Sequence, residues 1–209
     1  MSLLVAPEHR PTLREELAGL PNRSRGVAIA VLALLALAAV VLLARGTSEE
    51  GTRVVVEEPI AFNLRYPDSM KRIEDDTLFH LERKGVDEFI VEPLELPAYR
   101  GDVGGVLPVE ASREIERLRE RFPQLELVEE GKVRINRVAG YSLAFRASRS
   151  PRLYGRLVLL PEPVPGARSG VKLLMLATPK GGAGKARDVG TNGLLKTPYR
   201  SLRFGTEGP

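Results

Sequence analysis

The chain has 209 residues, with 31 basic and 27 acidic side chains, a formal net charge of +4 at pH 7 and no cysteine. The lack of cysteine excludes disulfides and thiolate metal sites, and two histidines make a transition-metal site improbable. The charge is uneven, since residues 45–130 carry 12 basic and 21 acidic side chains, whereas residues 131–209 carry 15 and 3. This asymmetry indicates either an anionic partner or, the reading we favour, two halves that neutralise each other within one sheet.

An uninterrupted apolar run covers Val27–Ala44. A helix of that length spans roughly 27 Å, close to the hydrocarbon thickness of a bilayer. A buried core helix would show a polar stripe, and this run has none. A cleaved signal peptide would have a shorter apolar region and small residues before the cut, whereas this run ends in Leu42-Leu43-Ala44. The run therefore predicts an uncleaved transmembrane helix over residues 27–44.

Basic residues near this run predict its orientation. Arg23 and Arg25 stand directly before it, so the positive-inside rule places residues 1–26 in the cytoplasm as a short tail. Residues 45–53 are polar and predict a tether. Residues 54–205 are then an extracytoplasmic domain, followed by a tail over 206–209. Abundant Arg, Ala, Leu, Gly and Pro indicate a bacterial protein, and hence the plasma membrane of a bacterium.

The domain reads as many strands and few helices. Alternating apolar residues bounded by Gly and Pro predict strands over residues 61–66, 78–83, 88–92, 125–129, 132–138, 141–147, 153–160 and 171–177. One amphipathic helix is predicted over Ser112–Phe122, where Ile115 and Leu118 share a face and Pro123 ends the helix. Residues 194–204 close the domain and leave room for a second helix. The predicted fold class is α+β, a mostly antiparallel sheet with one or two packed helices.

Three segments of this domain resemble the PsbP-like fold family. They are FNLRYP at residues 62–67, VRINRVAGYSLAFRA at 133–147 and PYRSLRF at 198–204. The family includes the photosystem II extrinsic proteins and the actinobacterial LpqN-type envelope proteins. The resemblance implies an α+β sandwich over about residues 54–204. It also implies a non-enzymatic protein, because members mostly bind partners or act as assembly factors and share no catalytic residues.

Two short motifs suggest chemistry, and each departs from its pattern. Lys180–Ala186, KGGAGKA, resembles the deviant phosphate loop of ParA and MinD-type ATPases, but Ala186 stands where the magnesium-binding hydroxyl belongs. Ser169 and Lys172 have the S-x-x-K spacing of penicillin-interacting serine enzymes, yet here the motif runs into a strand. We therefore predict a basic surface loop, no catalytic residue, no metal site and no cofactor. His80 is predicted to point outward from its strand.

The basic half contains six arginines that are candidate contacts for an anionic partner: Arg134, Arg137, Arg146, Arg149, Arg152 and Arg156. Interleaved aromatic residues resemble a surface on which nucleic-acid bases stack. The predicted extracytoplasmic position argues against nucleic acid, and those aromatics alternate as core residues do. Anionic lipid headgroups or a wall polymer are the partners that remain open for these arginines.

These observations predict a membrane-anchored, extracytoplasmic interaction or assembly module of a bacterial cell envelope, non-catalytic and with a protein partner. The alternative is a module that binds a lipid or other small molecule between sheet and helix. A hydrolase that uses Ser169 and Lys172 or the glycine-rich loop is a third hypothesis.

Overall fold

The computed structural model describes residues 27, 30–34, 51–85 and 87–207. The chain divides into two compact units, residues 1–49 and 50–209. In the first unit, residues 27 and 30–34 are helical. Among the described residues, no helix is both long and apolar enough to cross a membrane. The predicted cytoplasmic tail, most of the predicted transmembrane segment and residues 45–50 of the predicted tether lie outside the described residues.

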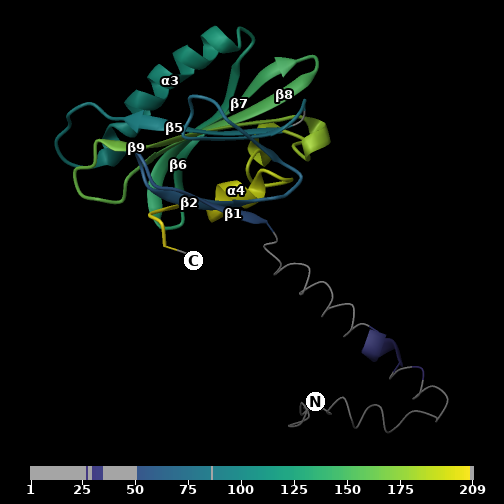
Figure 1. Ribbon diagram of the computed structural model, residues 1–209. Helices are drawn as coiled ribbons and strands as arrows, with labels where there is room; N and C mark the ends of the chain where they lie inside the picture. Colours follow the sequence, from purple (N-terminus) through teal and green to yellow (C-terminus); the bar gives the residue numbers. More distant parts are fainter. Residues whose placement is uncertain (1–26, 28–29, 35–50, 86, 208–209) are drawn as a thin grey trace, which may run out of the picture. The chain divides into compact units, whose positions relative to one another are not determined.

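Two antiparallel sheets form the second unit (Figure 1). The large sheet has the strand order β3-β4-β5-β9-β8-β7-β6, and the small sheet has the order β1-β2-β10. The strands of the large sheet are β3 Lys71–Ile73, β4 Phe79–Arg83, β5 Asp87–Glu95, β6 Glu126–Ile135, β7 Val138–Arg149, β8 Arg152–Pro161 and β9 Ser169–Ala177. Those of the small sheet are β1 Thr52–Val56, β2 Phe62–Tyr66 and β10 Arg203–Phe204.

Among the described residues of the second unit, two α-helices pack against these sheets and give three layers. Helix α3, Leu107–Arg121, covers one face of the large sheet, and helix α4, Lys196–Ser201, lies with the small sheet on the other face (Figure 1). Short 3₁₀ turns are η1 Val103–Gly105, η2 Pro179–Gly181 and η3 Ala186–Asp188. The predicted α+β class with a mostly antiparallel sheet is confirmed, and so is the second helix near the C-terminus.

Each face of the large sheet packs against its own apolar core because side chains alternate along a strand. Along β9, Leu173 and Met175 face the small sheet, whereas Leu174 and Leu176 face α3. A strand buried on both faces reads as a continuous apolar run, which is why VKLLMLA predicts a central strand. Lys172 interrupts this run on the side that faces α3.

One predicted turn is wrong. The sequence predicts two strands that meet at Gly131, but β6 runs straight through this residue, and the chain turns at Asn136 and Arg137 instead. These two residues have positive φ angles of 42° and 75°. Asn tolerates that conformation better than most residues, and its Nδ2 donates hydrogen bonds to the backbone carbonyls of Arg200 and Leu202 at 2.6 and 2.7 Å.

Several element boundaries also differ from the sequence prediction. Helix α3 begins at Leu107, five residues before the predicted start, because Pro108 suits the first turn of a helix and Leu107 extends the buried stripe. Strand β1 begins at Thr52, inside the predicted tether. Strands β1 and β3 were not predicted because both are short and largely exposed, so they lack a clear alternation.

Candidate functional site

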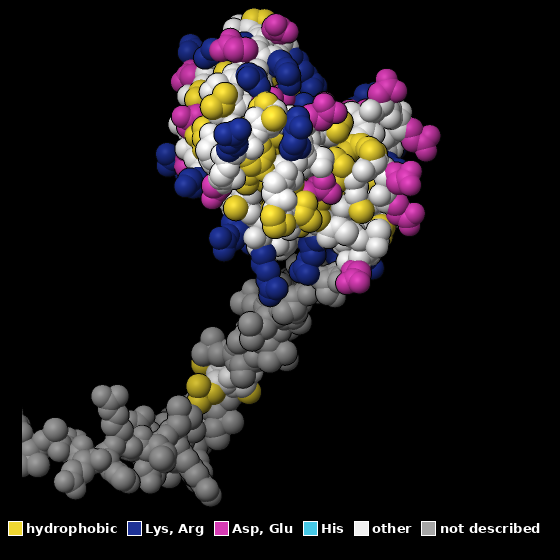
Figure 2. Space-filling view, turned by 90° about the vertical axis from the view of Figure 1, so that its left-hand side faces the viewer, with side chains coloured by type: hydrophobic (Ala, Val, Ile, Leu, Met, Phe, Trp, Pro, Cys, Tyr) yellow, Lys and Arg dark blue, Asp and Glu magenta, His cyan; other side chains and the backbone are white. Residues whose placement is uncertain are grey.

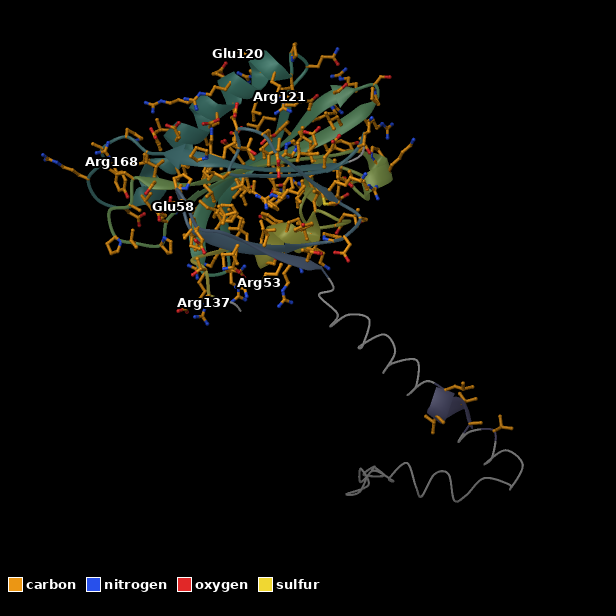
Figure 3. The ribbon with its side chains drawn as sticks, in the orientation of Figure 1. Arg53, Glu58, Glu120, Arg121, Arg137 and Arg168 are labelled. Carbon is orange, nitrogen blue, oxygen red and sulfur yellow. The ribbon has the colours of Figure 1, made fainter. Side chains whose placement is uncertain are left out.

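A cleft of about 490 Å³ opens at the edge of the contact between α3 and the large sheet. Its walls come from α3, from β5 with the residues after it, and from β9 with the residue before it. Most of the polar lining is charged, from Glu95, Glu110, Arg113, Glu114, Arg117, Arg168 and Lys172. Figure 3 shows Arg168 at the side of the domain below the start of α3. This charged cleft is the candidate site.

Lys172 forms the floor of the cleft. Its Nζ atom lies 3.2 Å from Glu92 Oε2 on β5 and 3.2 Å from Glu114 Oε1 on α3. The side chains of Lys172 and Glu114 are only 15% and 8% exposed. A buried charge is tolerated only when it is paired, so these contacts fix the position of α3 over the sheet.

The helix contributes two buried carboxylates one turn apart, Glu110 and Glu114. Arg113 Nη1 donates to Glu110 Oε2 at 2.9 Å, and Arg117 Nη1 donates to Glu114 Oε1 at 2.5 Å. Both arginine side chains are more than half exposed. Since a guanidinium group carries five N–H donors, each arginine keeps donors free at the rim of the cleft.

This lining determines which ligands the cleft can hold. The interior between α3 and the sheet is filled by packed apolar side chains, among them Ile90, Ile115 and Phe145. The open space beside it is charged, and an acyl chain placed there would desolvate ionised groups at a high cost in free energy. A ligand with its own carboxylates and amides matches the rim arginines and wall carboxylates far better.

Ser169 and Lys172 do not form a catalytic pair. Three residues apart in one strand, they point to opposite faces of the sheet. Ser169 Oγ donates to Glu162 Oε2, while Lys172 binds Glu92 and Glu114. The S-x-x-K spacing on a strand thus separates the two groups that a helix would bring together.

The backbone amides of the glycine-rich loop, Lys180–Ala186, donate hydrogen bonds to a carboxylate of this chain. The backbone N–H groups of Gly184 and Lys185 both donate to Asp188 Oδ2 at 3.1 Å. In a phosphate loop such amides would face the phosphate. The start of the loop packs on the sheet, because a Cβ on Gly181 would lie 1.8 Å from Asp87 Oδ1.

His80 is half-buried on β4 and points to the face opposite Phe79 and Leu81. Its Nδ1 lies 2.6 Å from Asp75 Oδ2. Hydrogen bonds from Thr77 and then from His80 lower the pKa of Asp75 to about 2. Within the part of the chain that the structure describes, no group of three or more metal-ligating side chains comes together.

The six candidate arginines do not form one surface. Arg146 and Arg149 both bind Glu126, and Arg156 donates to the carbonyl of Arg187 at 2.8 Å and lies 5.9 Å from the ring of Tyr199. Arg152 is exposed opposite Arg149 at the β7–β8 hairpin. Arg134 and Arg137 lie at the other end of β6.

Ion pairs between the two halves support neutralisation within the sheet. Arg146 pairs with Glu126, Arg187 with Glu129, and Lys172 with Glu92. Figure 2 shows Lys and Arg side chains interspersed with Asp and Glu side chains over the viewed face.

Sequence reasoning missed the charged cleft, although two signals for it were present. Glu110 and Glu114 fall on the same helical face as Ala111, Ile115 and Leu118. Lys172 stands within an otherwise apolar strand. A carboxylate on the apolar stripe of a helix and a lysine in a buried strand require opposite charges nearby.

Loss of the floor lysine is expected to destabilise the domain. The Lys172→Met variant leaves Glu92 and Glu114 without their shared cation, which should lower the free energy of unfolding by about 1–3 kcal/mol. Adding Glu114→Gln should recover part of this loss, because the two residues interact directly. Urea unfolding of both single variants and the double variant measures this coupling. Strict additivity would contradict the described contact.

Asp87 gives a prediction on pH dependence. Burial raises the pKa of its carboxyl group, and Arg83 Nε, 3.5 Å away, opposes this rise. Because the pKa of Asp87 is raised in the folded state, this group does not destabilise the fold below its unfolded pKa. The free energy of unfolding then falls as the pH rises through the folded pKa. The Asp87→Asn variant is therefore expected to gain stability relative to the wild type between pH 4 and pH 7. Urea unfolding at both values tests this, and a relative gain by the wild type would contradict it.

Comparisons with known proteins give the fold. No protein-family model matches the chain, and no curated protein matches it. Among solved structures, the cyanobacterial PsbP (CyanoP) of Synechocystis is 12% identical, with a TM-score of 0.51 over 76% of this chain and 95% of that chain. LpqN of Mycobacterium tuberculosis, described as involved in cell envelope biogenesis, is 9% identical, with a TM-score of 0.49 over 76% and 87%. The Ran-binding protein Mog1p of Saccharomyces cerevisiae is 11% identical, with a TM-score of 0.49 over 75% and 96%. The likeness to CyanoP shows the fold alone: the C-terminal unit of this chain has a PsbP-like fold.

Proposed function

We propose that this chain is a membrane-anchored, non-catalytic interaction or assembly module of a bacterial cell envelope. The charged cleft beneath α3 receives a polar segment of a protein partner. The observation that carries this proposal is the charged lining of the cleft, held on rigid secondary structure by the contacts of Lys172 with Glu92 and Glu114.

The sequence of the first unit supports the anchor. Val27–Ala44 has the length and composition of a membrane span, and Arg23 and Arg25 favour a cytoplasmic N-terminus. The PsbP-like domain then lies outside the plasma membrane.

The chemistry of the cleft favours a polypeptide over a lipid. Arg113 and Arg117 offer unused guanidinium donors, which bind carboxylates in two-pronged geometry. Glu110 and Glu114 lie beside them and can accept from amide or ammonium groups. A peptide segment carries all of these groups, whereas an acyl chain carries none.

Two observations support a non-catalytic role. Ser169 and Lys172 lie on opposite faces of β9. The amides of the glycine-rich loop bind Asp188. These are the two motifs that had suggested a hydrolase or a nucleotide site.

A small polar molecule is the second candidate ligand. A volume of about 490 Å³ falls within the usual range for small-molecule sites. The same charged lining selects a zwitterionic or anionic compound.

Two arginines on α3 provide a matched test. Arg117 and Arg119 each pair with a glutamate three residues earlier, but only Arg117 lines the cleft. In intact membranes, Arg117→Gln is expected to reduce crosslinking to the partner roughly tenfold, the worth of one charge-assisted hydrogen bond. Arg119→Gln should leave the crosslinking yield unchanged.

Equal yields in the two variants would place the partner on another surface. Unfolding midpoints of both variants show whether the fold is preserved. A retained small-molecule mass in native mass spectrometry that is lost only with Arg117→Gln would favour the second candidate ligand.

A further inference from the structure

The outer face of the small sheet is rich in arginine. Directly paired residues in an antiparallel sheet share a face, so Arg53, which pairs with Arg65, and Arg203, which pairs with Asn63, lie on one side. Phe62 and Leu64 point to the core, which places this side away from it. Arg53 and Arg65 thus place two guanidinium groups next to each other on this face.

Arg137 adds a fourth cation. It stands at a turn position where the backbone conformation favours glycine. It occupies the second central position of the β6–β7 turn with a φ of 75°. Glycine is favoured there because it adopts positive φ without steric strain. Asn136 fixes the turn through its two hydrogen bonds to the carbonyls of Arg200 and Leu202, so Arg137 is held beside the α4–β10 connection.

Arg137 and Arg203 line the same hollow, which has a volume of about 400 Å³. Its other lining residues are Asn136, Val138, Pro163 and Phe204, so the described lining contains no carboxylate. Within the described part of the chain, no acidic side chain lies at ion-pair distance from either arginine. We call this hollow the arginine hollow.

Neighbouring arginines extend the positive charge around the arginine hollow. Arg53 Nη2 donates to the backbone carbonyl of Thr206 at 2.9 Å. This carbonyl is uncharged, so the contact does not neutralise the guanidinium group. Arg200 is exposed at the end of α4. Figure 3 shows Arg53 and Arg137 extending from the same side of the domain, below β1 and β2.

Chain connectivity limits how far β1 can lie from the predicted membrane span. Strand β1 begins at Thr52, eight residues after Ala44. An extended chain of that length reaches about 28 Å at most. If Val27–Ala44 spans the bilayer, as proposed above, β1 and its sheet stay within reach of the lipid headgroups.

We propose that the arginine hollow, with Arg53 and Arg200, binds the phosphate headgroups of anionic lipids in the membrane that anchors the chain. This inference rests on the proposed anchor. Phosphate oxygens match the donor geometry of guanidinium groups, and cations near an anionic bilayer are attracted to its surface. Docking of this face would set which way the cleft beneath α3 points.

The full chain in lipid nanodiscs tests this proposal. A single cysteine introduced by Ser69→Cys, an exposed position in a chain without cysteine, carries a donor dye for energy transfer to headgroup-labelled lipid. We expect higher transfer in nanodiscs with 30% phosphatidylglycerol than in pure phosphatidylcholine, and loss of this difference in 0.5 M salt. Each arginine near an anionic surface contributes roughly a fivefold preference, so Arg137→Gly with Arg203→Gln should abolish most of the difference.

The control removes the same charge elsewhere. Arg134→Gln with Arg152→Gln changes two exposed arginines outside the arginine hollow and should keep the lipid dependence. Equal loss in both double variants, or no lipid dependence in the wild type, would overturn the proposal. Competition by soluble polyphosphate without lipid dependence would assign the arginine hollow to a free polyanion and overturn it as well. Failure of the chain to enter nanodiscs would instead refute the anchor.

Discussion

The ion pairs of Lys172 with Glu92 and Glu114 determine how the C-terminal unit is arranged on its α3 side. A cation in a central strand must meet opposite charge, and the structure supplies it from the neighbouring strand and from the helix above. This requirement fixes α3 along the sheet and thereby places Glu110, Arg113 and Arg117 around one cleft. The cleft is therefore a consequence of how a buried charge is satisfied. The apolar core beneath α3 supplies most of the stabilisation of this helix.

The large sheet separates two surfaces with different chemistry. On the α3 side, cations and carboxylates alternate within a cleft suited to a polar polypeptide segment. On the side of the small sheet, Arg137 and Arg203 line a hollow whose described lining includes no carboxylate. Some cations of the basic half are paired elsewhere, as in the pair of Arg146 with Glu126. Arg137 and Arg203 are therefore the cations that we propose for an anionic partner.

The fold class could be predicted because alternating apolar residues mark strands that face a core, and the pattern of Ile115 and Leu118 marks a packed helix. The β6–β7 turn was missed because a glycine does not oblige the chain to turn, whereas Asn136 is stabilised by carbonyls distant in sequence. The cleft was missed because Lys172 and Glu114 are 58 residues apart. The six candidate arginines are not brought together because they stand at different ends of the strands and successive strand residues point to opposite faces.

Membrane topology is the most direct test of the account, because the cleft can meet an envelope partner only if α3 lies outside the plasma membrane. The chain has no cysteine, so Ser112→Cys on α3 and Ser24→Cys before the apolar run each introduce a single thiol. In intact cells, a membrane-impermeant maleimide is expected to label the Ser112→Cys variant, and to label the Ser24→Cys variant only after permeabilisation. Labelling of Ser24→Cys in intact cells, with Ser112→Cys protected, would contradict the account.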